Sequence, residues 1–357
     1  MREVEKIFVR PSESIEDTIG IINRGSVGIA LVVEDDRRLL GTITDGDVRR
    51  AIIKKVPLDS EIRVLLGSEF RAADLARSLT AQVGIVRDQL LAVMRARDIR
   101  HIPLLDGLGR VVELALLSEL VEEDPSMRLT AVVMAGGEGQ RLRPLTEHMP
   151  KPMLPLNNRP LMERTIEQLK RSGVRKVAIA THYKSDIIAN HFGDGKNFGV
   201  DIDYITEERP LGTAGALGLM APPEGPTLII NGDIVTQLDF RSMHDFHRTH
   251  QAVMTVGVRV YELKIPYGVI HADDILITQL VEKPVQSVVV NAGIYLLEPA
   301  AFGFIPRGSS FHMTDLITRL LREGQRVIRF PIQEYWLDVG EHAEYLKANE
   351  DAKNGHL

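Results

Sequence analysis

The segment that most constrains this chain is an apolar, β-branched run, LTAVVMA at Leu129–Ala135, that stops at a cluster of glycines. An apolar run of this length that ends at glycine favours a strand buried on both faces, as in a parallel sheet. Gly136, Gly137 and Gly139 then permit backbone conformations that are closed to other residues, and they let N–H groups approach a ligand. Such a nest of N–H groups attracts anions. The segment therefore predicts an α/β domain with an anion-binding loop at a strand end.

Two permanent cations follow this loop. Arg141 comes two residues after Gly139, and Lys151 lies ten residues further on, within PKPMLP. Two cations beside a glycine nest suit a triphosphate with its metal. The loop is not a P-loop, because no Gly-Lys-Ser/Thr follows it, and it lacks the third glycine of the dinucleotide fingerprint.

Two aspartates are placed where an open α/β sheet would hold a ligand. TLIINGDIV, at Thr227–Val235, predicts a buried strand that delivers Asp233 at its C-terminal end. Asp338 follows the apolar-aromatic YWL. For an isolated aspartate in such a position, a turn or helix-cap role is the alternative.

The string AGGEGQRLRPLTEHMPKPMLP resembles the signature of sugar-1-phosphate nucleotidyltransferases, the enzymes that make NDP-sugars. VEKP, NAGIYLL and WLDVG follow at 281–284, 291–297 and 336–340, in the order of that family, so the resemblance covers Leu129–Leu357. Gln140 stands where the family often has threonine. The resemblance implies a Rossmann-like domain with a mixed, mainly parallel sheet. It also implies Mg²⁺- or Mn²⁺-dependent transfer of a nucleoside monophosphate from an NTP to a sugar 1-phosphate, which releases pyrophosphate.

The same resemblance implies roles for individual residues. It makes Asp233 and Asp338 the metal ligands, and it assigns catalysis to Arg141, Lys151 and Asp233. Lys283 would pair with the sugar phosphate, and Glu282 and Asn291 would meet the sugar hydroxyls. The expected nucleotide-binding residues are Ala135, Gly136, Gly137, Gly139, Glu207, Gly212 and Thr213.

The loop EERPLGTAGAL, at 207–217, bears on the choice of base. Guanine offers adjacent N1–H and N2–H₂ donors that one carboxylate can accept together, whereas uracil and thymine offer one imide N–H between two carbonyls. Glu207 occupies the position from which related enzymes read the base, and the loop looks like that of mannose-1-phosphate guanylyltransferases. GTP is therefore favoured, with UTP, CTP or dTTP as the alternatives. The other interpretation of Glu207 is a solvated side chain at a strand end.

The first third of the chain contains an internal repeat. The segment that begins at Ile15 aligns with the segment that begins at Arg87, at an offset of 72 residues, and the acidic turns at Glu34 and Asp106 coincide. Each copy predicts a helix, a strand, a turn, a second strand and the start of another helix, and we expect the two copies to pack together. This pattern resembles a tandem pair of CBS domains, an α+β regulatory module that often binds adenine nucleotides.

By that resemblance, Thr44 would meet a phosphate and Asp47 would accept from ribose hydroxyls. The second copy has Leu116 in place of the threonine, so its half-site is impaired. The alternative is that Thr44 and Asp47 only cap a helix, because both residue types are favoured there. CBS pairs tend to associate, so we expect a homo-oligomer.

Length and composition support a division of the chain into domains and limit the class of protein. The chain of 357 residues is long enough for two domains. We place the CBS pair at 1–122, with repeats at about 1–60 and 61–122, a charged linker at 123–128, and the catalytic domain at 129–357. The chain has no cysteine and a net charge of −6, with no signal peptide or long apolar run. We therefore expect a cytoplasmic protein with no nucleic-acid or membrane partner.

Two accounts of function remain. In the first, a CBS-regulated enzyme makes an NDP-sugar from a hexose or hexosamine 1-phosphate for glycan or nonulosonate precursor synthesis. This domain order is similar to that of CBS-linked transferases that use GTP and glucosamine-1-phosphate, and mannose- or heptose-1-phosphate stays open. In the second, the chain is a catalytically degenerate adenylate sensor.

Overall fold

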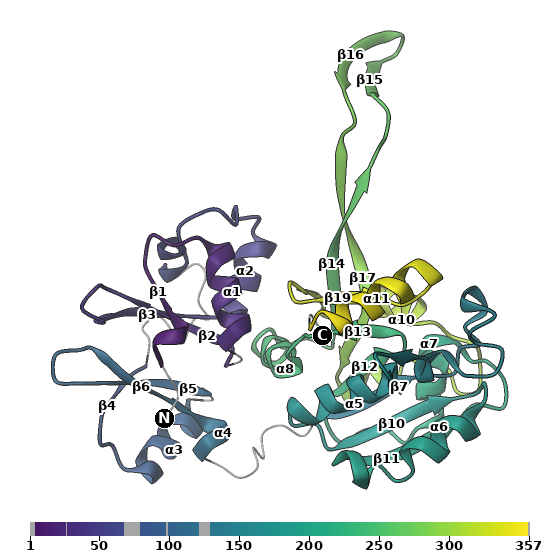
Figure 1. The fold of residues 1–357 in the computed structure, drawn as a ribbon, viewed down its shortest axis with the longest axis horizontal. Coiled ribbons are helices and arrows are strands. Elements are labelled where there is room, and N and C mark those ends of the chain that lie inside the picture. Colours follow the sequence, from purple (N-terminus) through teal and green to yellow (C-terminus); the bar gives the residue numbers. More distant parts are fainter. Residues whose placement is uncertain (1–3, 26, 68–78, 98, 121–128, 356–357) are drawn as a thin grey trace. The chain divides into compact units, whose positions relative to one another are not determined.

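The computed structural model describes residues 4–25, 27–67, 79–97, 99–120 and 129–355 (Figure 1). The chain divides into two compact units. Unit 1 comprises residues 1–128 together with Arg171–Val174 and Asp239–Gln251, and unit 2 comprises the remainder. The predicted linker at 123–128 lies outside the described residues. No helix in the described ranges has both the length and the apolar character needed to cross a membrane.

Unit 1 contains two copies of one small arrangement, each with a three-stranded sheet. The first copy contains β1 (Phe8–Val9), α1 (Ile15–Gly25), β2 (Ile29–Val33), β3 (Leu39–Thr44) and α2 (Asp45–Ile53), with η1 (Val4–Ile7) before it and η2 (Ile62–Leu66) after it. The second contains β4 (Ala81–Gln82), α3 (Arg87–Ala96), β5 (His101–Leu105), β6 (Val111–Leu116) and α4 (Leu117–Leu120). From α1 onward, each element of the second copy begins 72 residues after its counterpart, which is the offset found in the sequence.

The two copies of the repeat contact each other through equivalent positions. Arg38 forms an isolated antiparallel bridge with Arg110, its counterpart at the offset of 72. Beside this bridge, Leu31 and Val33 of β2 share one buried apolar cluster with Val111 of β6. A bridge between equivalent residues indicates an approximate two-fold relation between the copies.

A seven-stranded sheet forms the centre of unit 2. Its order is β11 (Asp201–Thr206), β10 (Lys176–Thr181), β7 (Thr130–Met134), β12 (Thr227–Asn231), β17 (Val285–Leu297), β14 (Met254–Lys264) and β18 (Val327–Pro331). The first four strands run parallel, β17 is antiparallel to both of its neighbours, and β18 is parallel to β14. The mixed, mainly parallel sheet expected from the sequence is confirmed.

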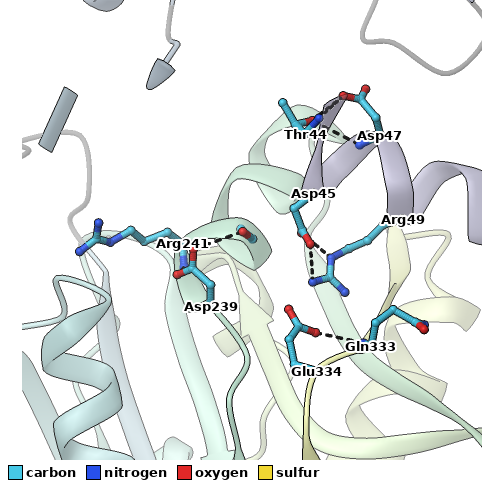
Figure 2. Close-up of polar contacts among 9 residues, drawn as sticks. Thr44, Asp45, Asp47, Arg49, Asp239, Arg241, Gln333 and Glu334 are labelled. Carbon is cyan, nitrogen blue, oxygen red and sulfur yellow. Dashed lines mark hydrogen bonds and ion pairs between the residues drawn. The ribbon is translucent and has the colours of Figure 1, made fainter. Parts of the chain in front are cut away.

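Helices cover this sheet through apolar faces. The helices of the C-terminal region are α5 (Leu161–Arg171), α6 (Ser185–Phe192), α7 (Gly212–Gly215), α8 (Phe240–Thr249), α9 (Pro299–Phe302), α10 (Met313–Arg322) and α11 (His342–Lys353). The side chains of Leu316 and Leu320 on α10 share one buried cluster with Val132 of β7 and Ile229 of β12. In the segment that groups with unit 1, Asp239 caps the N-terminus of α8, and its side chain accepts the Arg241 N–H over 3.0 Å (Figure 2).

Three two-stranded sheets and four short 3-10 helices complete the C-terminal region. The small sheets are β8 (Pro155–Leu156) with β9 (Arg159–Pro160), β13 (Ile234–Thr236) with β19 (Trp336–Asp338), and β15 (Val269–Asp273) with β16 (Leu276–Val281). The 3-10 helices in the described part of this region are η4 (Gln140–Leu142), η5 (Lys151–Met153), η6 (Lys196–Phe198) and η7 (Ala216–Leu219). The β13–β19 sheet matters most for the candidate site.

Candidate active site

The parallel strands of unit 2 end at one edge of the sheet. Met134 of β7 lies in register with Ala180 of β10 on one side and Asn231 of β12 on the other. The segments that follow these strands and their neighbour β11 carry the glycine loop, Asp233 and Glu207. Open α/β sheets bind ligands at this edge.

Asp233 and Asp338 are brought together by the small β13–β19 sheet. Ile234 pairs with Asp338 in this sheet, and the Val339 N–H donates to the carbonyl oxygen of Asp233 over 3.0 Å. Asp233 directly precedes β13, and Asp338 is the last residue of β19. The two aspartates predicted to bind metal are therefore neighbours.

Each of these two carboxylates has one buried oxygen that lacks a donor. Asp233 Oδ1 and Asp338 Oδ1 are both buried, and neither has a hydrogen-bond partner among the described residues. Burial, and next the negative charge of Asp233, raise the pKa of Asp338 to about 6. A buried carboxylate oxygen without a donor is costly unless a proton or a cation neutralises it. The pair thus has the electrostatics of a cation site.

The donor set fits Mg²⁺ or Mn²⁺. No group of three or more His, Asp or Glu side chains suited to a metal occurs in the described part of the chain. Mg²⁺ is commonly held by one or two carboxylates, with substrate phosphates and water as its other ligands. Asp233 and Asp338 match such a site, because each keeps an oxygen that no donor occupies.

Lys151 is already engaged with one of these aspartates. Its Nζ lies 2.5 Å from Asp233 Oδ2, and the two side chains are 11% and 26% exposed. The glycine loop passes close to this lysine at Gly139, where a Cβ would lie 3.1 Å from Lys151 Cβ and 2.9 Å from Thr146 Cγ2. Gly139 also has a φ of +63°, a region that favours glycine. The loop and the cation are thus held together, as the sequence predicts.

Arg141 lies near the second aspartate. A Cβ on Gly340 would be 3.4 Å from both Arg141 Nη2 and Asp338 Oδ1, so the guanidinium and the carboxylate flank the same glycine. The positive charges of Lys151 and Arg141 lower the pKa of Asp338 and partly offset its burial. Arg141 is exposed, and its Nη1 is 3.5 Å from Glu341 Oε1. An exposed guanidinium at this place has room to turn toward an incoming phosphate.

The first residues of the glycine loop differ in their surroundings. The Ala135 N–H donates to the Ala180 carbonyl oxygen over 2.8 Å, so this N–H is used in hydrogen bonding to the neighbouring strand β10. A Cβ on Gly137 would meet no atom within 4 Å, whereas one on Gly136 would lie 2.7 Å from Glu207 Oε1. The open part of the loop therefore begins after Gly136.

Glu207 is buried beside this loop, with 6% of its surface exposed. Its Oε2 accepts the Leu211 N–H over 2.8 Å, and its Oε1 lies next to Gly136. Burial raises the pKa of this carboxyl. Glu207 is thus not a solvated side chain at a strand end. It joins the glycine loop to the loop at 208–211, the segment expected to face the base.

Gly212 and Thr213 of α7 contact the residues at the start of α10. Thr213 Oγ1 accepts the Met313 N–H over 2.9 Å. Gly212 has a φ of +81°, and a Cβ there would lie 2.8 Å from the Phe311 carbonyl oxygen. The close packing of α7 against the start of α10 is therefore sufficient reason for this glycine, although the sequence suggested ligand contact. A nucleotide role for these two residues stays a prediction.

β14, β15, β16 and β17 form one long hairpin, with β15 and β16 at its tip. Asn291 lies on β17, at the end of this hairpin that joins the central sheet. Its Nδ2 donates to the Tyr295 hydroxyl over 2.8 Å, and its Oδ1 accepts the Gly293 N–H over 3.0 Å. The charge of Asp233 contributes to raising the pKa of Tyr295, after burial, so this hydroxyl is near the carboxylate group. Asn291 itself is exposed and stands close enough to serve the same site.

Glu282 and Lys283 are not brought to this group. They lie between β16 and β17, at an exposed part of the long hairpin. A Cβ on Gly268, the residue before β15, would lie 2.9 Å from Glu282 Oε2. The sequence placed them with the sugar phosphate near Asn291. In this structure the hairpin carries them away from it, because its strands continue as an extended ladder beyond Asn291.

The site also includes two side chains that the sequence did not single out. Asn231 Oδ1 and Glu344 Oε2 are buried without a hydrogen-bond partner among the described residues. Glu344, on α11, also raises the pKa of Asp338 by repulsion. Asn231 stands two residues before Asp233, so its position at the strand end was the available signal. No sequence signal pointed to Glu344, because only the tertiary fold brings α11 to this edge of the sheet.

In unit 1, Thr44 and Asp47 form a capping box at the start of α2 (Figure 2). Asp47 Oδ2 accepts the Thr44 N–H over 2.7 Å, and the Asp47 N–H donates to Thr44 Oγ1 over 3.3 Å. Asp47 Oδ1 also pairs with Arg50 Nη2 at 2.5 Å. Both side chains therefore do what the helix-capping alternative predicted, and their contact with a nucleotide stays a prediction.

Comparison with known proteins agrees with this architecture. A family model described as nucleotidyl transferase matches residues 130–355. The chain belongs to the nucleotidyl transferase family. A CBS domain model matches residues 1–54, which is the first copy of the repeat.

Relatives of this nucleotidyl transferase include two mannose-1-phosphate guanylyltransferases. The one from Candida albicans is 34% identical over 229 residues, which cover 61% of this chain and 63% of the relative. The one from Mycobacterium tuberculosis is 31% identical over 237 residues, which cover 64% of this chain and 66% of the relative. The chain thus spans less than two thirds of the length of these relatives.

The fold of this nucleotidyl transferase is also seen in a solved structure from Bacillus anthracis, assigned as a glucose-1-phosphate thymidylyltransferase. The match has a TM-score of 0.52 and 24% identity, and it covers 63% of this chain and 96% of that one. At this identity the match concerns the fold alone.

Proposed function

We propose that this chain transfers a nucleoside monophosphate from an NTP, with GTP favoured, to a sugar 1-phosphate. An oxygen of the sugar phosphate forms a bond to the α-phosphorus as the bond from that phosphorus to the bridging oxygen breaks. Pyrophosphate leaves with the electron pair, and the NDP-sugar is the product. The observation that carries the proposal is the pair of buried, partner-free oxygens on Asp233 and Asp338, next to Lys151 and the glycine loop.

The residues of the chain act mainly by position and charge. Both substrates are polyanions, so cations and orientation contribute more than a protein base. The N–H groups after Gly136 would face the triphosphate, and Arg141 would face the departing pyrophosphate. Lys151 would exchange part of its contact with Asp233 for a phosphate oxygen. Asn291 would orient the sugar, since an amide both donates and accepts.

Asp233 and Asp338 would hold Mg²⁺ or Mn²⁺. When bound, the ion supplies charge neutralisation at the α-phosphate and at the incoming phosphate. The orphan oxygens of the two aspartates support this assignment, as does the raised pKa of Asp338.

The preference for GTP is supported by Glu207 and by the relatives. Glu207 lies beside Gly136, where its Oε1 borders the glycine loop. An ionised carboxylate has about four lone-pair sites, so the Leu211 N–H leaves capacity for the two donors of guanine. The guanylyltransferase names of the relatives favour the same base. UTP, CTP and dTTP are the alternatives.

The sugar is proposed as a hexose or hexosamine 1-phosphate. The named relatives favour mannose-1-phosphate. The similarity in domain order to CBS-linked transferases that use glucosamine-1-phosphate keeps that sugar as the other candidate. The product would serve glycan or nonulosonate precursor synthesis.

An adenylate-sensing role is proposed for the CBS unit, as regulator of the enzyme. The match at residues 1–54 supports it, as do Thr44 and Asp47 at a helix N-terminus. A nucleotide at 100 times its dissociation constant would stabilise the folded chain by about 2.7 kcal/mol. The test is the melting temperature of the full chain with ATP, ADP or AMP, and an unmoved value would reject the role.

The test of the proposed activity is product analysis with Mg²⁺. GTP, UTP, CTP, dTTP and ATP would each be combined with glucosamine-, N-acetylglucosamine-, mannose- and glucose-1-phosphate, and the products would be identified by mass spectrometry. We expect an NDP-sugar with GTP and no product with Asp233→Asn. A pyrimidine product would reject the role of Glu207 but keep the enzyme. No product in any combination would favour the degenerate adenylate sensor.

A further inference from the structure

His182 directly follows β10 and lies at the ligand edge of the central sheet. β10 is bordered by β7 and β11, the strands that lead into the glycine loop and into Glu207 (Figure 1). A Cβ on Gly136 would lie 3.5 Å from His182 Cβ. Burial raises the pKa of Glu207, and the Leu211 N–H and then the charge of His182 lower it. The His182 ring is therefore a neighbour of both the glycine loop and the Glu207 carboxylate.

Two hydrogen bonds hold this segment in place. Nδ1 of His182 lies 2.8 Å from the main-chain oxygen of Glu207. The hydroxyl of the next residue, Tyr183, donates to the carbonyl oxygen of Thr146 over 3.1 Å. A recognition side chain that is held by such contacts is pre-organised for its ligand. The ring of His182 is thus anchored before a nucleotide binds.

The bond to Glu207 also decides which ring nitrogen of His182 carries the proton. A carbonyl oxygen only accepts, so Nδ1 donates, and in a neutral imidazole the other nitrogen, Nε2, is then an acceptor. Nε2 has no hydrogen-bond partner among the described residues, and the side chain is partly exposed. The anchored ring therefore keeps one accessible acceptor beside Glu207.

The order of the strands sets the distance between this acceptor and the carboxylate pair. Asp233 follows β12, which lies beyond β7 and is the second strand from β10. Neighbouring strands are about 4.8 Å apart, so the ends of β10 and β12 are on the order of 10 Å apart. A nucleotide that lies along these strand ends can place its phosphates at β7 and β12 and its base at β10 and β11.

Guanine is the base whose donors match the acceptors at β10 and β11. Its N1–H and the two hydrogens of its N2 amino group lie side by side along one edge. Oε2 of Glu207 already accepts the Leu211 N–H, so the carboxylate can take N1–H and one amino hydrogen, and Nε2 of His182 can take the other. In adenine and cytosine a ring-nitrogen acceptor stands beside the amino group, and that acceptor would face the carboxylate.

We propose that Nε2 of His182 accepts a hydrogen from the exocyclic amino group of guanine and thereby selects GTP over nucleotides that lack this group. The inference rests on the proposed function, which places the base beside Glu207. In this division of roles, Glu207 distinguishes guanine from the pyrimidines, and His182 distinguishes guanine from hypoxanthine. A purely structural histidine would use Nδ1 alone, to tie the end of β10 to β11, so the test has to separate the two ring nitrogens.

Nucleotide binding to the full chain tests the proposal without measuring turnover. GTP, UTP and ITP, which is GTP without the amino group, would each be titrated into the protein by calorimetry with Mg²⁺ present. We expect the wild-type chain to bind GTP at least about 10-fold more tightly than ITP. Equal affinity for GTP and ITP would overturn the inference. Tighter binding of UTP than of GTP would reject the proposed base preference, and the inference with it.

Two substitutions separate the ring nitrogens of His182. The amide of asparagine can replace Nδ1, so His182→Asn keeps a donor for the main-chain oxygen of Glu207 and removes the acceptor. The amide of glutamine reaches the position of Nε2, so His182→Gln keeps an acceptor and loses the anchor. We expect His182→Asn to melt like the wild-type chain and to lower the GTP-to-ITP affinity ratio by about 10-fold. His182→Gln should melt at a lower temperature and retain more of the ratio.

The decisive outcome is the affinity ratio of His182→Asn. If this variant prefers GTP over ITP as strongly as a wild-type chain that prefers GTP over UTP, the ring is structural only, and the inference fails while the proposed base preference stands. His191→Asn, which changes a histidine paired with Glu163 on α6, is the matched control and should keep the wild-type ratio. An equal loss in both variants would also overturn the inference.

A second nucleotide analogue identifies the edge of guanine that the ring contacts. 7-Deaza-GTP keeps the N1–H and amino edge and lacks N7, so we expect the wild-type chain to bind it as tightly as GTP. If 7-deaza-GTP bound weakly and ITP bound as tightly as GTP, the ring would donate to N7, and the inference would be wrong.

Discussion

Lys151 donates to Asp233 across 82 residues of sequence, with Nζ 2.5 Å from Oδ2. The pair joins the segment after the glycine loop to the end of β12. It also leaves the other oxygen of Asp233, and Oδ1 of Asp338, without a donor. A single lysine thus neutralises part of a carboxylate pair whose remaining free oxygens suit a divalent cation.

Replacing Lys151 by methionine should affect both stability and activity. Asp233 would lose its cation while remaining largely buried, so we expect a loss of about 2 kcal/mol, below the 3–5 kcal/mol of a fully buried pair because Asp233 is partly exposed. The turnover rate should fall by about 100-fold or more. Urea unfolding and pyrophosphate release measure the two effects. Lys176→Met, an exposed lysine at the start of β10, is the matched control and should change neither.

The pKa of Asp338 predicts how Mg²⁺ stabilisation varies with pH. Because this pKa is raised to about 6, the ionised form is disfavoured in the folded chain. The contribution of Asp338 to stability therefore declines as pH rises from the unfolded value of 3.8 to about 6, and a bound cation offsets the loss. Below pH 6, protons compete with the metal.

We therefore expect Mg²⁺ to raise the melting temperature more at about pH 7.5 than at about pH 5. Asp338→Asn should abolish this difference and should stabilise the metal-free chain above pH 6, because it removes one charge of the pair. Equal Mg²⁺ effects at both pH values in the wild-type chain would argue against Asp338 as a ligand.

Two adjacent glycines provide a matched pair of variants. A Cβ at Gly136 would lie 2.7 Å from Glu207 Oε1, whereas a Cβ at Gly137 would meet no atom within 4 Å. Gly136→Ala should displace Glu207, lower the melting temperature and weaken discrimination between GTP and UTP. Gly137→Ala should fold normally and raise the KM for the nucleotide, since its methyl group would project into the space proposed for the phosphates. If both variants kept the wild-type KM, the nucleotide would not lie against this loop.

The strand-end residues were predictable because local pattern decides them. An apolar run that ends in glycines, or in Asp233, places its last residues at the ligand edge of a parallel sheet. The repeat in unit 1 was equally visible, since equivalent elements recur at a fixed offset. The closeness of Asp233 and Asp338 could not be predicted from local pattern alone, because it depends on the pairing of β13 with β19.

Other features depend on tertiary structure that no short pattern records. Gly212 looks like a ligand-facing glycine in sequence, but a side chain there would clash with the carbonyl oxygen of Phe311. Glu344 reaches the site because α11 packs beside β19. Lys283 belongs to a motif expected at the sugar, and only the register of β14 with β17 shows how far the hairpin carries it from Asn291.

Thr44 should contribute to stability as a helix cap. Its side chain and that of Asp47 satisfy each other's backbone N–H groups at the start of α2. Thr44→Ala should destabilise unit 1 by about 1 kcal/mol, and Thr44→Ser, which keeps the hydroxyl, by less. Chemical denaturation of the full chain, followed by a probe in unit 1, measures this loss. Equal stability of the alanine and serine variants would show that the cap contributes nothing.

The most direct test of the account is a Mg²⁺ titration of pyrophosphate release from GTP and a sugar 1-phosphate. The wild-type chain and Asp203→Asn, which replaces an exposed carboxylate on β11, should show the same saturable Mg²⁺ dependence. Asp338→Asn should require much more Mg²⁺ and release pyrophosphate about 100-fold more slowly. If Asp338→Asn retained wild-type rates at the same Mg²⁺ concentration, the Asp233–Asp338 pair would not be the metal site, and the central claim would be contradicted.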